Sequence, residues 1–164
     1  MLTLQQYQQI KNSDRIIMSE DEKIIFKDKS NSQNHLHKPN GLWYAAGTEW
    51  IDWVRNEMPH WEQPHFFKLE IDPSKVLIID TSEKLQEFEN IYKKDPEKSS
   101  WDTDDKFWES RAMIKWSLVA QEYSGIEIIP YQRGMRNHAW YNGWDVASGC
   151  IWKRDGISGI KRIV

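Results

Sequence analysis

The spacing of apolar residues along the chain predicts both helices and strands. Apolar positions three and four residues apart predict helices at 3–12, 48–56, 81–92 and from 104 or 105 to about 123. Alternating or continuous apolar runs predict strands at 22–27, 42–46, 65–71, 75–80 and 126–131. Helices and strands do not alternate strictly, so the pattern favours an α+β fold.

Local signals set the limits of these elements. Thr3, Thr48 and either Thr81 or Ser82 are N-cap residues in front of the first three helices. In the third helix, the residues expected to face the core are Leu85, Phe88, Ile91 and Tyr92. In the long fourth helix they are Trp108, Ala112, Trp116, Val119 or Ala120, and Tyr123. The charged stretch 93–104 predicts a surface loop within one domain that spans residues 1–164.

Residues 38–54 form the stretch around which the rest of the chain is expected to be arranged. Asn40-Gly41 predicts a turn, residues 42–46 a short strand, and Gly47 its end. Behind Thr48, the residues at helical spacing are Trp50, Trp53 and Val54. Aromatic residues at such spacings usually pack in a core, which is the interpretation we favour for Trp53. For Trp43 and Tyr44, core packing and the wall of a pocket for a flat ligand are equally good interpretations.

A second informative stretch runs from 140 to 152. Asp145 stands between Trp144 and Val146, and a carboxylate buried among such residues is costly unless it is paired or hydrogen-bonded. Asp145 is therefore a functional candidate, with a turn aspartate that caps backbone amides as the alternative. Ser148 lacks the neighbours of a nucleophilic serine, so we expect it to hydrogen-bond. Cys150 has apolar neighbours, which favour an inert buried thiol.

Composition narrows the function classes. The chain has 164 residues, a net charge of −3 and one cysteine, so it offers no overall basic field and no intramolecular disulfide. No apolar run approaches the roughly 20 residues of a membrane span, and the N-terminus does not have the pattern of a signal peptide. These features favour a cytoplasmic protein without a membrane partner. Ten tryptophans exceed what a core of this size needs, so some are expected to line a cleft.

Five histidines raise the alternative of a metal-dependent hydrolase. His35 and His37 would share one face of an extended chain, and the remaining three are His60, His65 and His138. Their spacing matches no metal-binding motif, so we expect no metal. The basic loop with Arg133 and Arg136 could meet a phosphate, but solvated charge is the interpretation we favour.

The segment Gly41-Leu42-Trp43-Tyr44-Ala45 resembles the Gly-Leu-Tyr-Phe-Ala/Ser strand of mono- and poly-ADP-ribosyltransferases. The resemblance covers about a dozen residues. The blocks at 75–81 and 125–131 also look similar to parts of small phage and bacterial proteins of this type. The resemblance implies a mixed or split antiparallel sheet with flanking helices, and NAD as a substrate.

In that family an early strand, a middle aromatic strand and a late acid surround NAD. By resemblance, Gly41, Trp43 and Tyr44 would belong to the nicotinamide site, and Asp145 would be the late catalytic acid, with Glu127 in reserve. The early strand would end near Phe26, where this sequence lacks the His-Gly or Arg-Gly of the family. Lys27 or Lys38, or a histidine at 35 or 37, would have to substitute there. We also include Ser148 among the candidate NAD-binding residues.

The resemblance implies that nicotinamide leaves NAD and that an acceptor attacks the ribose. A protein or nucleic-acid acceptor would make the chain a toxin or a phage defence or counter-defence modifier, whereas water would make it an NADase. The rival class is a non-catalytic aromatic cage that binds a nucleotide or another flat ligand. The sequence leaves the acceptor and the oligomeric state open.

Overall fold

A computed structural model describes residues 1–35, 37–94 and 111–164. Seven strands form one sheet in the order β4-β7-β8-β2-β1-β3-β9. Their bounds are β1 Arg15–Ser19, β2 Leu42–Ala46, β3 His65–Ile71, β4 Val76–Ile79, β7 Gly125–Ile128, β8 Ser148–Ile151 and β9 Ile157–Arg162. Only β4 and β7 run parallel, so the sheet is mixed. A separate two-stranded ribbon pairs β5 (Lys93–Lys94) with β6 (Met113–Ile114).

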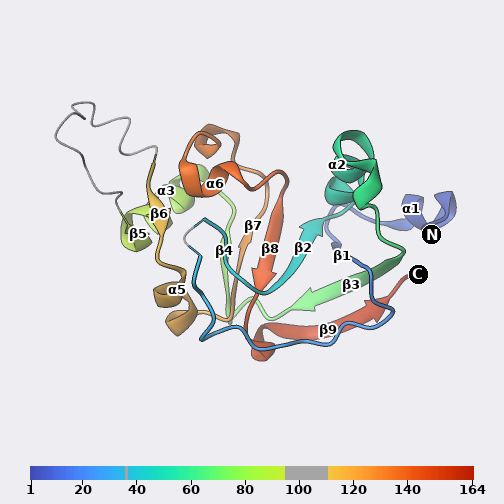
Figure 1. Ribbon diagram of the computed structural model, residues 1–164, viewed down its shortest axis with the longest axis horizontal. Coiled ribbons are helices and arrows are strands. Elements are labelled where there is room, and N and C mark those ends of the chain that lie inside the picture. The colour runs from blue at the N-terminus through green and yellow to red at the C-terminus, as the bar shows by residue number, and fades with distance from the viewer. Residues whose placement is uncertain (36, 95–110) are drawn as a thin grey trace.

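The helices lie in two groups on one face of the sheet. The first group is α3 (Ser82–Tyr92), α5 (Trp116–Glu122) and α6 (Ala139–Asn142), and the second is α1 (Leu4–Gln9) with α2 (Glu49–Glu57). Short 3₁₀ turns are η1 (Pro59–Trp61), η2 (Arg133–Met135) and η3 (Arg154–Gly156). In Figure 1 the first group stands beside β4 and β7, and α2 stands above β1 and β2, so a gap in the helical layer lies over the centre of the sheet.

Alternation along β2 assigns its side chains to the two faces of the sheet. Trp43 lies opposite Cys150 of β8, and Tyr44 lies opposite Gly149. We call the face that carries Trp43 and Ala45 the pocket face, and the face that carries Tyr44 the ion-pair face. The largest core cluster packs α3, α5 and α6 on the pocket face, and a second cluster with Tyr44 and Ile17 fills the ion-pair face.

The expected α+β class is confirmed at this level, and most predicted elements are present. The strand predicted at 22–27 is wrong, because Ile24 and Phe26 pack on the ion-pair face without joining a ladder. The strand preceding them is β1, which the apolar pattern did not single out. In α3, the prediction that Ile91 faces the core is wrong, because Ile91 is 70% exposed. Glu89, two residues earlier, is buried instead.

The long helix predicted from 104 is also wrong in its described part. Residues 113–114 form β6 and only Trp116–Glu122 are helical. Trp108 and the proposed helix start lie outside the described residues. Thr48 occupies the N-cap of α2, but its hydroxyl donates to Asp52 (2.8 Å) instead of accepting from a helix amide.

Candidate functional site

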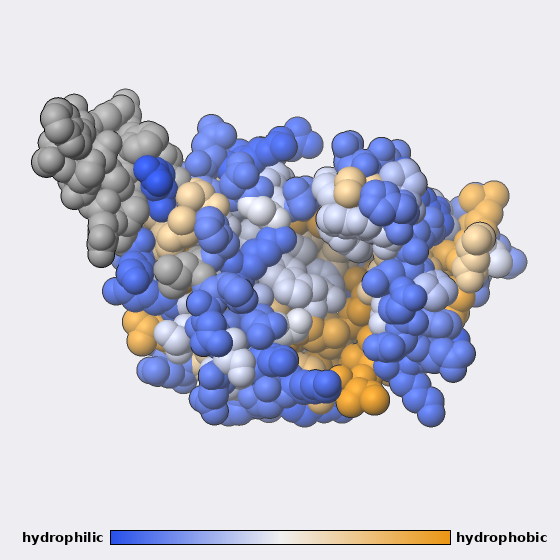
Figure 2. Space-filling view, viewed as in Figure 1, coloured by the Kyte–Doolittle hydropathy of each residue, from blue (hydrophilic) through white to orange (hydrophobic). Residues whose placement is uncertain are grey.

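A cavity of about 250 Å³ opens on the pocket face, between the two groups of helices. Its floor comes from β1, β2 and β8, one wall from Trp50 of α2, and the opposite wall from the loop that joins α6 to β8. The lining residues are Ile16, Met18, Lys38, Trp43, Tyr44, Ala45, Trp50, Trp144, Asp145, Val146 and Ser148. Figure 2 shows the hollow as a pale and orange area between two bluer masses.

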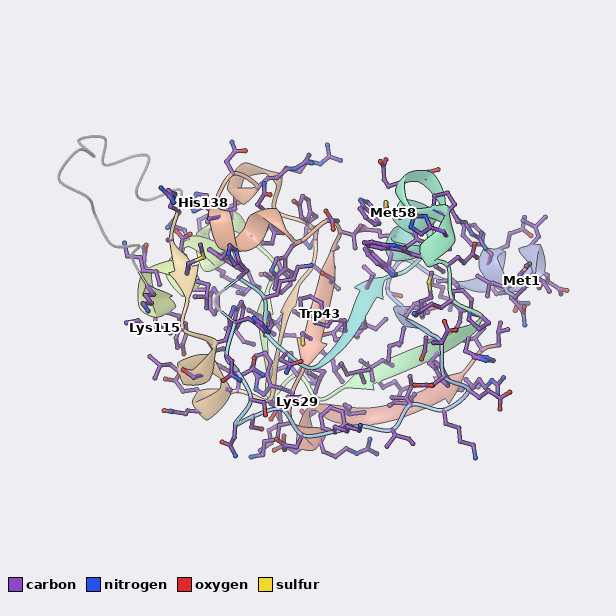
Figure 3. All side chains as sticks on the ribbon, in the orientation of Figure 1. Met1, Lys29, Trp43, Met58, Lys115 and His138 are labelled. Carbon is purple, nitrogen blue, oxygen red and sulfur yellow. The ribbon has the colours of Figure 1, made fainter. Side chains whose placement is uncertain are left out.

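Trp43, labelled in Figure 3, contributes an aromatic surface to this cavity. Its ring is held edge-on by Trp144, with ring centroids 4.9 Å apart and planes at 70°. The ammonium of Lys38 lies over the Trp43 ring, 5.2 Å from its centroid, in a cation–π contact. Burial lowers the pKa of Lys38, and the nearby charge of Asp145 opposes that shift. The cavity therefore already holds one cation against an indole face.

Asp145 lies at the rim of the cavity, before the start of β8. The expectation that it is buried is wrong, because its side chain is exposed. Among the described residues, no hydrogen-bond donor or cation lies within bonding distance of its carboxylate, so the turn-cap alternative finds no support in the geometry either. The carboxylate is free to face a ligand in the cavity.

Ser148 is buried at the cavity floor. Its hydroxyl donates to the carbonyl of Val146 (3.0 Å), which agrees with a hydrogen-bonding role rather than a nucleophilic one. Ser148 begins β8 and lies opposite Ala45 of β2. This pairing brings the loop that carries Asp145 beside the strand that carries Trp43.

Tyr44 reaches the other side of the sheet from Trp43. Although Tyr44 contributes to the cavity lining, its hydroxyl donates to Glu127 Oε1 (3.0 Å), and only 3% of the residue is exposed. Burial and the adjacent carboxylate of Glu127 raise the pKa of Tyr44 well above its ordinary value. The hydroxyl therefore serves the ion-pair face and is not available to a ligand in the cavity.

Glu127 does not line the cavity. On the ion-pair face it accepts two hydrogen bonds from Arg15, at 2.5 Å from Nε and 3.2 Å from Nη2. This pair joins β7 to β1 across the two intervening strands β8 and β2. Tyr44 can cross β8 because Gly149 has no side chain: a Cβ there would lie 2.3 Å from the Tyr44 hydroxyl. We read Glu127 as part of a structural network, since buried carboxylates need such partners.

Besides Glu127, two predicted residues lie away from the cavity lining. Lys27 is exposed on the segment that follows β1. Gly41 is not in a left-handed conformation; Gly47 is the glycine with positive φ (52°) in the described chain. A Cβ at Gly41 would come within 2.5 Å of the Ile151 carbonyl, so Gly41 is required for the close approach of β2 to β8.

The sequence interpretation missed three residues of this region. Trp144 and Trp50 were noted only as neighbours of other candidates, although both line the cavity. Arg15 was missed because it lies in a strand whose short apolar run gives a weak signal. A charged residue directly before Ile16 and Ile17 is the only sign in the sequence that this strand carries a partly buried ion pair.

The histidines do not converge. Among the described residues, no group of three His, Cys, Asp or Glu side chains is placed to hold a metal ion. His138 instead contacts Glu89 (2.6 Å), which also accepts a hydrogen bond from Trp140. Within the same residues, no helix has the length and apolar character needed to cross a bilayer.

Comparisons with protein-family models, with curated proteins and with solved structures found no match to this chain. The geometry of the cavity and the short sequence resemblance are therefore the basis for a functional proposal.

Proposed function

We propose that this protein binds oxidised NAD in the cavity on the pocket face and transfers its ADP-ribose to a macromolecule. The observation that carries the proposal is the cation that already lies on Trp43, with a free carboxylate beside it. The nicotinamide ring of oxidised NAD is itself a flat cation. It would take the same place on the indole face, where such contacts contribute about 0.5–2 kcal/mol.

The size of the cavity limits how much of NAD it can hold. A volume of about 250 Å³ lies just below the roughly 300–1,000 Å³ of sites for drug-sized ligands. One ring and its sugar fit such a space, and the rest of the dinucleotide would extend over the rim. Lys38, displaced from Trp43 by the nicotinamide, would then meet the phosphates at the mouth of the cavity.

Asp145 is the proposed catalytic residue. As the bond between nicotinamide and ribose lengthens, positive charge develops on the ribose, and the carboxylate of Asp145 beside it would stabilise that charge. In the bound state the ligand would cover Asp145 and exclude water, which strengthens this interaction. Glu127, the reserve acid, lies on the opposite face and is assigned no part in the reaction.

The order of the strands also supports the proposal. The resemblance implies that an early, a middle and a late strand come together around NAD. The segment expected as the early strand, 22–27, is not a strand, and β1, which precedes it, takes that place in the proposal. With β1 in that place, the three strands β1, β2 and β8 are neighbours in the sheet. The ADP-ribosyltransferase-like fold is part of the proposal. So are a macromolecular acceptor, a role as a toxin or phage defence modifier, and action in the cytoplasm.

The test combines calorimetric titration with NAD and measurement of nicotinamide release. Enzymes bind substrates with KM values of about 1 μM to 1 mM, so NAD should bind in that range, and reduced NAD, whose ring is neutral, should bind more weakly. Trp43→Leu keeps an apolar side chain but removes the aromatic face, and should weaken NAD binding several-fold. Ile91→Ala, an exposed change on α3, is the matched control.

Asp145→Asn separates catalysis from binding. It should bind NAD nearly as well as the wild type and release nicotinamide about 10²-fold more slowly, because the charge acts mainly in the transition state. Absence of NAD binding by the wild type would overturn the proposal. Binding without any nicotinamide release, with or without cell extract as acceptor, would instead favour the non-catalytic aromatic cage.

A further inference from the structure

Three tryptophans form a continuous row over α2 and η1. Trp50 and Trp53 stack face to face, with centroids 4.9 Å apart and planes within 7°. Trp61 follows at 6.1 Å from Trp53 in a tilted arrangement. Trp61 is 48% exposed, and Trp50 and Trp53 are half-buried. We call these three residues the tryptophan row. The sequence predicted core packing for Trp53, but its ring lies in this partly exposed row.

The row begins at the cavity. Trp50 forms one wall of the cavity and is also the first ring of the row, so the aromatic surface runs from the site out to η1. In Figure 2 the surface of α2 borders the hollow directly. A chain lying along the row would therefore reach the mouth of the cavity.

The charge around the row is negative. Residues 49–62 carry four carboxylates and one guanidinium. That guanidinium belongs to Arg55, which forms an ion pair with Glu62 (2.7 Å) and a cation–π contact with the ring of Tyr7. Glu57 lies on the same side of α2 as Trp50 and Trp53, at helical positions i+7 and i+4. Among the described residues Glu57 has no ion-pair partner.

We propose that the tryptophan row binds a segment of a partner protein that is rich in arginine or lysine. Cationic side chains stack on tryptophan faces, and arginine does so most readily because its guanidinium is planar and weakly hydrated. Glu57 supplies the complementary charge. The suggestion that this segment is the acceptor rests on the proposed function, whereas the binding itself does not.

The same charge argues against a nucleic acid. Single-stranded nucleic acids also stack on aromatic rows, but their phosphates require a basic groove. Residues 49–62 carry a net negative charge, and Glu57 lies on the same side of α2 as Trp50 and Trp53, so this surface would repel a phosphate backbone. A basic protein segment is the occupant that satisfies both the aromatic rings and their surroundings.

The experiment uses fluorescence anisotropy with the full-length protein and no NAD. The probe is a labelled nine-residue peptide of glycine and serine with three arginines, compared with versions in which glutamine or glutamate replaces arginine. The arginine peptide should bind most tightly, and its affinity should fall as salt is raised, because exposed charges are screened. A single-stranded oligonucleotide and a neutral oligosaccharide serve as competing probes.

Two variants locate the binding site. Trp61→Ala and Glu57→Gln alter exposed side chains, and each should weaken binding of the arginine peptide about two- to five-fold. This is the range expected for one exposed cation–π contact at Trp61 and for one exposed ion pair at Glu57. Ile91→Ala, which removes an exposed apolar side chain from α3, should leave peptide affinity unchanged. Circular dichroism confirms that each variant is folded.

The outcomes separate this inference from the proposed function. No binding of the arginine peptide, equal binding of the glutamine peptide, or unchanged affinity in both variants would overturn the inference. Preferential binding of the oligonucleotide or oligosaccharide would overturn it as well. Peptide binding by a wild-type protein that fails to bind NAD would support the docking surface while the proposed enzymatic function fails.

Discussion

Replacing Glu127 by glutamine tests whether this residue stabilises the fold or performs chemistry. The glutamine keeps the size of the side chain and one acceptor oxygen, but removes the negative charge that faces Arg15. It also places an amide donor opposite the guanidinium, where the structure has Nη2 donating to Oε2 at 3.2 Å. The change therefore removes the ion pair and can keep only one of its two hydrogen bonds, in a largely buried position.

The expected loss of stability follows from the burial of the two partners. Removing one partner of a fully buried ion pair costs about 3–5 kcal/mol, because the other charge is left without compensation. The Glu127 side chain is 5% exposed, but that of Arg15 is 30% exposed, so water can solvate part of the guanidinium. We therefore expect a loss of about 2 kcal/mol in the free energy of unfolding.

The assay is urea denaturation together with nicotinamide release per folded molecule. Glu127→Gln should lower the free energy of unfolding without changing turnover, and the matched Asp145→Asn should do the reverse. Asp145 is exposed, so its loss should change stability by no more than about 0.5 kcal/mol. A drop of about 10²-fold in turnover per folded Glu127→Gln molecule would refute this reasoning and make Glu127 the catalytic acid.

Three further predictions follow from the same residues. Gly149→Ala should lower the free energy of unfolding by about 1–3 kcal/mol, because the added Cβ would overlap the Tyr44 ring. Gly134→Ala, whose Cβ meets nothing within 4 Å, should leave that free energy nearly unchanged in denaturation experiments. The free energy of unfolding should fall above about pH 10, by up to about 1.4 kcal/mol per pH unit from Tyr44 alone. The reason is that Tyr44 ionises there in the unfolded chain but stays protonated in the folded chain, where its pKa is raised. Urea denaturation of Tyr44→Phe at the same pH values should show a shallower decline. Lys38→Gln should weaken NAD binding several-fold in calorimetry, because it removes the cation that meets the phosphates. Nicotinamide riboside, which lacks phosphates, should bind no more weakly, since it no longer has to displace the Lys38 ammonium from Trp43; equal weakening of both ligands would contradict the phosphate role of Lys38.

Elements with strong local signals could be predicted from the sequence. Thr81 caps α3 by accepting from Lys84, and Leu85, Phe88 and Tyr92 face the core as their spacing indicates. The strand at 42–46 follows from a short apolar run between two glycines. These signals act over a few residues, so tertiary contacts are not needed to recognise them.

Elements that depend on distant partners were predicted poorly. The apolar pattern predicted that Ile91 of α3 faces the core, but Glu89 is buried and Ile91 is exposed. Glu89 can be buried because His138 and Trp140, from another part of the chain, contact its carboxylate. Ile24 and Phe26 look like a strand, yet they cover the ion-pair face without ladder partners. Asp145 was expected to be buried from its neighbours in sequence, but the loop turns its side chain outward.

The separate roles of Trp43 and Tyr44 follow from their adjacency in one strand. Successive side chains of a strand point to opposite faces of the sheet, so two neighbouring aromatics of β2 cannot both present their rings to the same pocket. The sequence interpretation treated Trp43 and Tyr44 as equivalent candidates for the nicotinamide site. In the structure the Trp43 ring lines the cavity, whereas the Tyr44 hydroxyl donates to Glu127 of the Arg15–Glu127 pair. Trp43 is held independently of the ion pair, by the ladder between β2 and β8 and by the edge-on contact with Trp144. Loss of the pair in Glu127→Gln should therefore loosen the cavity floor only as the sheet itself opens, and NAD affinity measured below the unfolding transition should stay at the wild-type value.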